Sequence, residues 1–409
     1  MGSYSNEYST YKMLKTNKID GNIISNSAMF DAKITEKDSN GFYDVILNRK
    51  SFEGITNNKI LGNYLEQNYS DNSNSKKLNL YDAYKLLSTN KELNIAIDNT
   101  FGTRIYPNIQ KQTYDIIKFT NNKIENNVFD TPATINMRYI AGYDYSVFDI
   151  DSSDSLEGYI TKLSGIYLGM DKKVSSTYRM GGLFNLTENH TNFTHTAKRE
   201  DKTYQGTLFS IYEKDSLKVI NTIFTGINRG DLKRNYSFST INENLKGKLK
   251  NNYFGLNNSI EKKIEFENDY FLKPKVSLNY ISLNQKGINE SGDYGIKIDS
   301  LNSNSLEGKV ELEFGKKFNF ENGVYLELKP IIAYSYEMLN PYKDIDASIS
   351  TLSEDNYRID AYNAKRGNVE LGVKIEFGKS EFKSYIEYLN IQNEAKNMHI
   401  TSAGLKYSW

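Results

Sequence analysis

The chain has 409 residues, with 51 Lys and Arg balanced by 51 Asp and Glu, and it contains no cysteine. This balance excludes a general electrostatic attraction to nucleic acid, and the lack of cysteine excludes disulfides, thiol catalysis and cysteine-ligated metal sites. Mean hydropathy is −0.62, and no run approaches the ~18 consecutive apolar residues of a membrane helix, which excludes a helical membrane protein.

Residues 1–50 are predicted to be rich in short strands. Residues 28–34 and 41–49 are strand candidates, and the turn cluster 38–41 separates them. The N-terminus lacks a basic start followed by an apolar core, so no signal peptide is predicted. We therefore expect that, if the protein is exported, this chain is a piece of a longer one.

Residues 51–130 are predicted to be helical. Apolar side chains recur at helical spacing over residues 55–65 and 80–97, and the polar loop 70–75 lies between them. A third helical pattern covers residues 109–130, whose face is weakly apolar and rich in Asn and Lys. A helix this polar does not fit a dry protein core. At ~1.5 Å per residue it reaches roughly 33 Å, enough to cross the hydrocarbon layer of a membrane.

From about residue 134 to the C-terminus, apolar and polar residues alternate. In residues 369–377, for example, Val, Leu, Val, Ile and Phe alternate with Glu, Gly, Lys and Glu. This pattern predicts strands with one apolar face. We count about twelve such segments, and an even number fits a single-chain bacterial barrel. The segments are 134–147, 158–171, 175–189, 201–213, 216–229, 243–256, 270–284, 304–318, 323–337, 363–378, 380–392 and 398–409.

Alternation alone also fits a soluble β-sandwich or β-helix, whose outer faces are solvated. Three features favour a membrane barrel. The segments have about the ~9–11 residues needed to cross a bilayer at a tilt. Long polar stretches such as 299–305 and 343–355 alternate with short links such as 319–323 and 378–380. Aromatic residues gather at strand ends, where interfacial girdles form.

Two further patterns concern particular strands. Leu272-Lys273-Pro274 is followed by Tyr280 at the same offset at which Leu328-Lys329-Pro330 is followed by Tyr336, which indicates a repeated hairpin unit. In the last strand, an apolar residue occupies every second position up to the C-terminal aromatic residue. These residues are Ala403, Leu405, Tyr407 and Trp409, and they alternate with Ser402, Gly404, Lys406 and Ser408.

With these residues, the chain over about 40–409 resembles the translocator domain of monomeric autotransporters (type Va secretion). The resemblance is carried by the polar helix 109–130, the two Leu-x-Pro strands, the strand 369–377 and the ending 402–409. It implies an all-β transmembrane barrel of about twelve antiparallel strands with a helix in the lumen, preceded by a small helical and β passenger-end segment.

The resemblance also implies a division of the chain and a location. Residues 1–50 would be the end of a passenger, 51–106 a helical junction, 107–133 the lumen linker helix and 134–409 the barrel. The protein would lie in the bacterial outer membrane with its N-terminal part at the cell surface, where it exports or tethers the passenger. Its partners would be membrane lipid and lipopolysaccharide, its own passenger, and the barrel-assembly machinery, which would recognise the terminal strand from Ala403 to Trp409. We expect a monomer that binds no nucleic acid.

The lumen helix carries the remaining expectations. Its candidate site residues are Tyr114, Lys118, Asn122, Lys123 and Asn126. The Lys, Asn and Glu side chains of the helix would face Glu311, Glu313, Lys374 and Glu376 on the inner face of the wall. Some autotransporters cut themselves between two asparagines of this helix. Here Asn126-Asn127 and Asn121-Asn122 are the available pairs.

Other functions stay open at this point. An outer-membrane channel or porin needs no upstream lumen helix, whereas a surface adhesin module needs no barrel. No enzyme is predicted, because Gly-x-Ser-x-Gly is missing, and no cofactor or metal site is predicted. His190 and His195 are interpreted as residues of a solvated loop. Residues 246–250 include three lysines. They would bind lipopolysaccharide phosphates or, alternatively, form a solvated loop or a lumen face.

Overall fold

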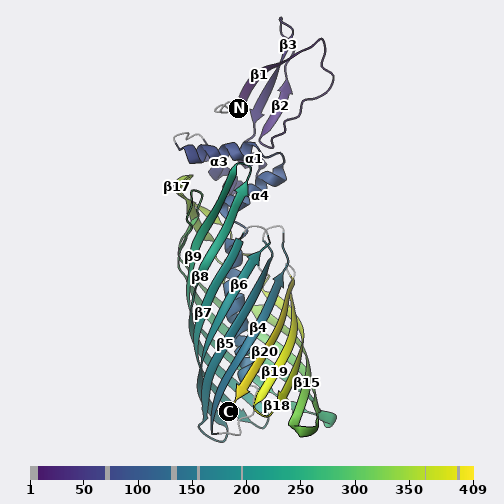
Figure 1. The fold of residues 1–409 in the computed structure, drawn as a ribbon, viewed down its shortest axis with the longest axis vertical. Helices are drawn as coiled ribbons and strands as arrows, with labels where there is room; N and C mark the ends of the chain where they lie inside the picture. The colour runs from purple at the N-terminus through teal and green to yellow at the C-terminus, as the bar shows by residue number, and fades with distance from the viewer. Residues whose placement is uncertain are drawn as a thin grey trace.

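Within the described residues of the computed structural model, twelve antiparallel strands close into a barrel (Figure 1). Closure comes from two pairings, the last strand with the first and β9 with β11. The predicted fold class is therefore confirmed. The barrel strands are β4 (Met137–Ile150), β5 (Tyr159–Lys173), β6 (Tyr178–Phe193), β7 (Ala197–Lys214), β8 (Leu217–Phe238), β9 (Ile241–Lys262), β11 (Tyr270–Gln285), β14 (Leu301–Asn319), β15 (Val324–Glu337), β18 (Gly367–Lys379), β19 (Phe382–Gln392) and β20 (Asn397–Ser408). The structure describes residues 8–69, 74–129, 136–153, 157–194, 197–363, 365–393 and 397–409.

Short turns join the strands at the end of the barrel that holds the C-terminus (Figure 1). Asp215 and Ser216 form one of these turns and both have positive φ, as a two-residue hairpin turn that matches strand twist requires. Two other turns repeat one design, in which Asn268 and Asn322 take left-handed backbone within a single 3-10 turn. Each of these turns leads into one of the Leu-Lys-Pro strands, β11 and β15.

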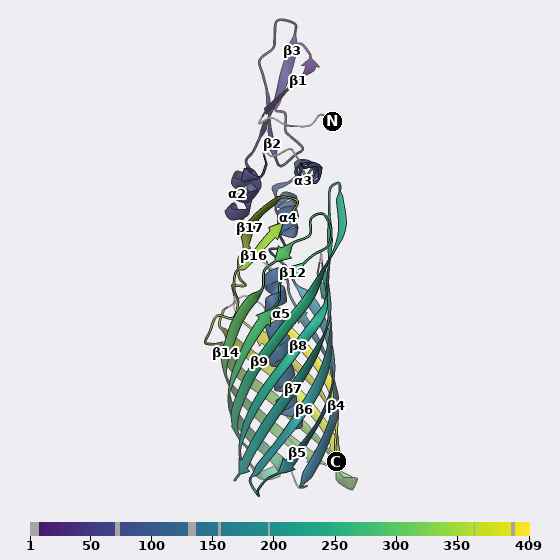
Figure 2. The same cartoon turned by 90° about the vertical axis from the view of Figure 1, so that its left-hand side faces the viewer.

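The N-terminal part lies beyond the other end of the barrel (Figure 2). Strands β1 (Tyr8–Lys15), β2 (Phe30–Ile34) and β3 (Phe42–Arg49) form a small sheet in the order β1-β3-β2, in which β1 is an addition to the predicted strands. Four helices follow, and we call them the cap. They are α1 (Phe52–Ile55), α2 (Lys59–Gln67), α3 (Ser75–Lys85) and α4 (Asn90–Phe101).

Local sequence explains where the cap helices begin and end. Asn58 and Asn74 accept hydrogen bonds from backbone N–H groups at the starts of α2 and α3. Thr89 and Glu92 form a reciprocal capping box at the start of α4. Gly102, with a φ of 65°, ends α4 in the left-handed conformation that favours glycine.

The links at the cap end of the barrel hold structure that periodicity did not predict. Strands β12 (Ile288–Asn289), β13 (Lys297–Ile298), β16 (Ile345–Ile349) and β17 (Ser353–Ile359) form a second small sheet. The stretch 343–355 lies in a long link at the cap end, as expected, but it forms strands and is only partly polar. Ile345, Ala347 and Ile349 are buried there because they belong to the apolar cluster that includes the cap.

The β8–β9 hairpin is longer than predicted, since its strands run through 217–238 and 241–262 instead of 216–229 and 243–256. Its far half leaves the barrel and reaches the cap (Figure 1). There Leu232, Tyr236 and Leu245 are buried in the same cluster as the cap helices. Contact with the cap thus extends the pairing beyond the membrane-crossing length.

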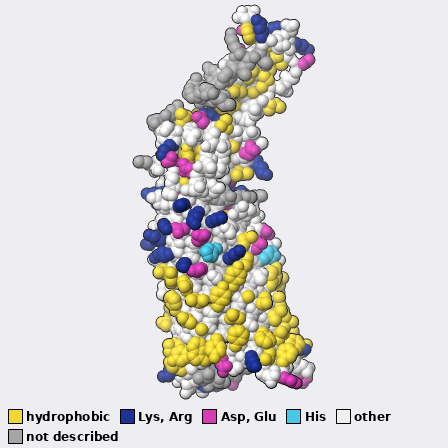
Figure 3. All heavy atoms as spheres, viewed as in Figure 1, with side chains coloured by type: hydrophobic (Ala, Val, Ile, Leu, Met, Phe, Trp, Pro, Cys, Tyr) yellow, Lys and Arg dark blue, Asp and Glu magenta, His cyan; other side chains and the backbone are white. Residues whose placement is uncertain are grey.

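The barrel exterior is apolar in a band. Val310, Leu312, Leu371 and Ile375 each expose about two fifths or more of their surface. Figure 3 shows hydrophobic side chains covering the lower part of the barrel, with charged side chains gathered above them. This face suits lipid hydrocarbon. None of the helices in the described part of the chain is long and apolar enough to cross a membrane.

Candidate functional site

The barrel lumen holds a fifth helix, α5 (Tyr106–Val128), which runs from the cap toward the C-terminal end (Figures 1 and 2). Pro107 occupies its first turn, where the missing N–H does no harm. Most of its side chains are buried although many are polar, and Asn108, Gln110 and Gln112 have no exposed surface. Such burial needs polar partners. Gln112 finds them on the inward faces of β5 and β6, whereas Asn108 donates to the Glu157 carbonyl and Gln110 accepts from the Lys343 N–H, both in links at the cap end.

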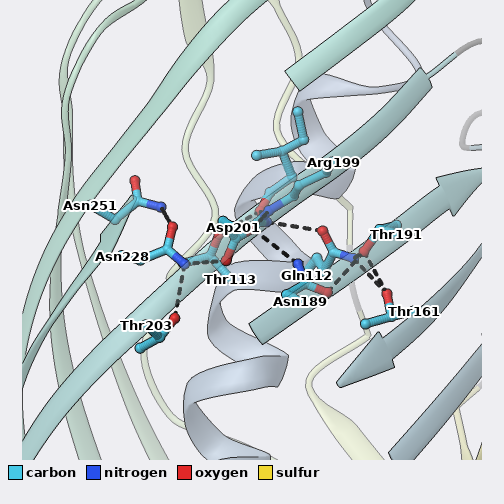
Figure 4. Close-up of polar contacts among 11 residues, drawn as sticks. Gln112, Thr113, Thr161, Asn189, Thr191, Arg199, Asp201, Thr203, Asn228 and Asn251 are labelled. Atoms are coloured by element: carbon cyan, nitrogen blue, oxygen red, sulfur yellow. Dashed lines mark hydrogen bonds and ion pairs between the residues drawn. The ribbon is translucent and has the colours of Figure 1, made fainter. Parts of the chain in front are cut away.

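Near its start, α5 is held by a polar network from β7 (Figure 4). The Arg199 guanidinium is fully buried and donates to Gln112 Oε1 at 2.9 Å, Thr113 Oγ1 at 3.1 Å and the Ile109 carbonyl at 3.3 Å. It also forms an ion pair with Asp201, so its charge is compensated without water.

The same network continues around the wall. Gln112 Nε2 donates to Thr161 Oγ1 at 2.6 Å and to Thr191. Asp201 accepts from Asn189 at 3.0 Å and from Asn228. The sequence pattern did not single out these residues. Their signal was the polar half of the alternation in β5–β8, which was interpreted only as the face opposite the lipid.

Farther along, α5 is held by ion pairs. Lys118 Nζ lies 2.7 Å from Glu307 Oε2 and 2.8 Å from Glu337 Oε2, and Lys123 pairs with Glu387. Glu125 lies 2.8 Å from Lys275 Nζ. These pairs run from the helix to β11, β14, β15 and β19, so charges of both signs fix α5 to its wall.

The other predicted helix residues also face inward. Tyr114 Oη lies 2.7 Å from Ser303 Oγ, and Asn126 Oδ1 accepts from Lys275 at 3.0 Å. Asn122 lines a cavity beside the helix. Asn127 Oδ1 accepts from Lys374 at 2.8 Å, and its carbonyl accepts from Lys406 at 2.6 Å.

The three wall carboxylates that we expected to face the helix form ion pairs with lysines of the wall. Glu311 lies 3.1 Å from Lys309, and Glu313 lies 3.0 Å from Lys273. Glu376 lies 3.0 Å from Lys383 and 3.2 Å from Lys329. The helix meets a different set of carboxylates, those of Glu307, Glu337 and Glu387.

A cavity of about 440 Å³ remains on one side of α5. Its lining residues come from the helix, from β4, β14, β15, β18, β19 and β20, and from the link between β15 and β18. Among them are Lys118, Asn122, Lys123, Glu307, Glu337 and Glu387. The helix therefore fills the lumen unevenly. It is hydrogen-bonded closely to β5–β7, whereas on its opposite side Lys118 and Lys123 form their ion pairs beside this cavity.

The cap is fixed to the mouth of the barrel by buried polar contacts. Arg234 of β8 lies 2.6 Å from Glu290, with both side chains buried, and donates to the Asn99 carbonyl of α4. Tyr236 Oη lies 2.7 Å from Thr100 Oγ1. Tyr357 of β17 donates to the Phe101 carbonyl at 3.2 Å.

A second contact joins the cap to the small N-terminal sheet. The Arg49 guanidinium of β3 pairs with Glu66 of α2, and the Phe52 N–H donates to Glu66 Oε2 at 2.8 Å. Burial raises the pKa of the Glu66 carboxyl, but these two partners outweigh burial and hold the pKa below its usual value.

The terminal strand closes the barrel. Ser408 pairs with Ile140 of β4, and the Tyr139 N–H donates to the Trp409 carbonyl at 2.8 Å. The rings of Trp409 and Tyr139 stack with centroids 6.0 Å apart. Ala403, Leu405, Tyr407 and Trp409 are exposed on the outer face, and the residues between them point inward.

Two interpretations of charged or titratable residues are wrong. His190 belongs to β6 instead of a loop, because its backbone pairs with Glu200 of β7; His195 lies outside the described residues. Lys246, Lys248 and Lys250 belong to β9 and are exposed on the outer face, so they form neither a loop nor a lumen face. Within the described residues, no group of three or more His, Asp or Glu side chains could hold a metal ion.

A sequence model of the family described as Autotransporter beta-domain matches residues 140–388. The chain belongs to this autotransporter family. As an autotransporter translocator it resides in the bacterial outer membrane, anchors or exports a passenger, and presents that passenger at the cell surface. The family is one of translocator barrels and is not an enzyme family.

Three solved structures are among those similar to this autotransporter. The translocator domain of autotransporter NalP from Neisseria meningitidis is 12% identical, with a TM-score of 0.56, and the match covers 73% of this chain and 96% of that one. The β domain of the Bordetella autotransporter BrkA is 14% identical, covers 67% and 99%, and has a TM-score of 0.47. The transport unit of AIDA-I from Escherichia coli is 11% identical, covers 71% and 97%, and has a TM-score of 0.44. No curated protein sequence matched the chain.

Proposed function

We propose that α5 and the cap keep this barrel closed and tether its passenger as one continuous chain. In this proposal residues 1–50 are the passenger end, 51–106 the cap, 107–133 the lumen linker and 134–409 the barrel. The ion pairs of Lys118 with Glu307 and Glu337 carry the proposal, because they bind the tether to the wall inside the membrane. A porin would leave this space open.

Conductance of the protein in planar bilayers tests the plug. Removing residues 1–128 should raise conductance strongly, because the lumen of a twelve-stranded barrel is wider than its own side chains can fill. Removing residues 1–50 should leave conductance low. Removing residues 1–105 deletes the cap and keeps α5, so this variant separates the contribution of the cap to low conductance from that of α5. An unchanged conductance after removal of 1–128, in protein that still migrates as a heat-modifiable barrel, would reject the plug.

We also propose that the barrel-assembly machinery recognises the outer face of β20. The exposed row Ala403, Leu405, Tyr407 and Trp409 supports this, since it ends in an aromatic residue beside Tyr139. The variant W409A should slow the appearance of the heat-modifiable form in cells. Y139A removes the other ring of the stack and is the matched control. Equal slowing by both variants would point to barrel closure instead of recognition.

The remaining proposals concern chemistry and lipid. The chain itself is proposed to catalyse no reaction. Asn126 and Asn127 accept hydrogen bonds from lysines of the wall and so hold the helix in place. In the outer leaflet its partner is proposed to be lipopolysaccharide, which surrounds the barrel on the cap side. The cap side faces the cell surface because the passenger lies there.

A further inference from the structure

The outer face of β7, β8 and β9 carries two rows of cations at the cap end of the apolar band. Lys202, Arg229 and Lys250 are direct cross-strand neighbours in one row. Lys198, Lys233 and Lys246 are neighbours in the other. We call these six residues the basic surface. Figure 3 shows charged side chains gathered at this height, directly above the hydrophobic band.

This register is unfavourable without a ligand. Side chains directly opposite each other on antiparallel strands have Cβ atoms ~5 Å apart, and like charges at that spacing are destabilising. Part of the charge is compensated, because Lys202 lies 2.6 Å from Glu188 and Lys233 lies 3.1 Å from Glu200. In the described part of the chain, no ion pair involves the other four members of the basic surface. A third row lies between these two, in which Glu200 and Asp231 are cross-strand neighbours and Asp231 lies 2.6 Å from Lys248. The cations of the outer face still outnumber these carboxylates, so the face can accept an anion.

The residues next to the basic surface indicate what kind of anion this is. In the next two outward rows toward the membrane, Tyr204, Ile227 and Phe254 are apolar and each about two fifths exposed. The other positions of these rows are Asn252, Thr225 and Gly206. A ligand that spans both regions needs phosphate groups beside apolar chains. The basic rows end at β9, because the next two strands of the wall, β11 and β14, present Ser282 and Asn304 outward at the cap end.

We propose that the basic surface binds the phosphate groups of lipid A, the phosphorylated glycolipid that anchors lipopolysaccharide. The Arg229 guanidinium donates to the Asn228 and Asn251 carbonyls and to Asn252 Oδ1. Its remaining N–H groups suit phosphate oxygens, and the lysines around it supply further charge. The acyl chains lie against Ile227 and Phe254. This inference rests on the lipid partner proposed above and gives that partner a site on one side of the barrel.

Titration of the full-length protein in detergent with bisphosphorylated lipid A tests the site. The variant R229Q/K246Q/K250Q should bind at least tenfold more weakly, since each basic residue near a lipid surface contributes measurably to anionic lipid binding. K172Q/K262Q/K379Q removes three outward lysines at the far ends of β5, β9 and β18 and should bind like the unaltered protein. Lipid A stripped of both phosphates should also bind at least tenfold more weakly.

Equal affinity of R229Q/K246Q/K250Q, an equal loss in the control variant, or equal binding of the dephosphorylated lipid would each overturn the proposal. Displacement of lipid A by inorganic phosphate at matched concentration would reassign the surface to a free anion and also overturn it. Heat-modifiable migration confirms that each variant is folded. If the triple variant does not fold, K250Q alone, whose side chain is exposed, replaces it. Conductance of the same samples should stay low. A protein with low conductance that does not bind lipid A would therefore reject this inference without contradicting the proposal that α5 plugs the barrel.

Discussion

Lys118 of α5 and Glu337 of β15 lie 2.8 Å apart inside the barrel, although 219 positions separate them in sequence. Glu307 lies on the other side of the same ammonium group at 2.7 Å. One lysine thus compensates two carboxylates, and the three side chains are 10% to 14% exposed. The attachment of the helix to the wall depends strongly on this one cation.

The variant K118M should destabilise the barrel, because it leaves two largely buried carboxylates without their cation. Loss of one partner of such a group costs about 3 kcal/mol, and we expect a lower midpoint in urea unfolding followed by heat-modifiable migration. K76M removes the exposed partner of Asp293 in the cap and should cost less than about 1 kcal/mol. Equal losses of stability in the two variants would contradict the assignment of Lys118 as the cation that compensates the two carboxylates.

The variant R234Q should loosen the cap from the barrel. It leaves the Glu290 carboxylate buried without its cation and removes the bond to the Asn99 carbonyl, which again costs about 3 kcal/mol. Protease added to intact cells should then cut residues 51–106 faster. The neighbouring variant K233Q breaks only an exposed pair, so its cleavage rate should match that of the unaltered protein.

The contact between the N-terminal sheet and the cap should weaken in acid. The Glu66 pKa is lower in the folded protein than its ordinary value of 4.5. Its stabilising contribution is therefore complete above that value and is lost as pH falls through the lower, folded pKa. Proteolysis between β3 and α2 should accelerate over that acidic range. In E66Q the rate should no longer depend on pH there, and a persistent dependence would point to another carboxyl.

The chain should remain intact at Asn126-Asn127. Self-cleavage requires a side-chain amide nitrogen to attack its own backbone carbonyl, and here both residues are helical. Lys275 and Lys374 also hold the two carboxamides against the wall. Mass spectrometry of the purified protein should give one species that continues upstream of Asn121. A barrel fragment beginning at Asn127 would contradict this prediction, and its loss in N126Q would locate the reaction.

Much of the barrel was predictable because each strand meets lipid on one face and a polar lumen on the other. Val369, Leu371 and Val373 alternate with polar or small residues for this reason, and a local pattern is enough to detect it. The polar helix was predictable in the same way, since its composition fits no dry core. Strands β16 and β17 were missed because their burial depends on the cap, a contact across the whole chain.

The sequence alone determined the number of strands, the outward row that ends in Trp409, and the presence of a polar helix before the barrel. Each follows from periodicity over a few residues, which solvent and lipid impose locally. Only the tertiary structure decided that Arg199 meets Gln112 across 87 positions, that Lys118 meets Glu337, and that β8 and β9 extend to hold the cap. Those contacts depend on strand register and on where the helix rests in the lumen, because many inward polar residues are chemically equivalent until the barrel closes.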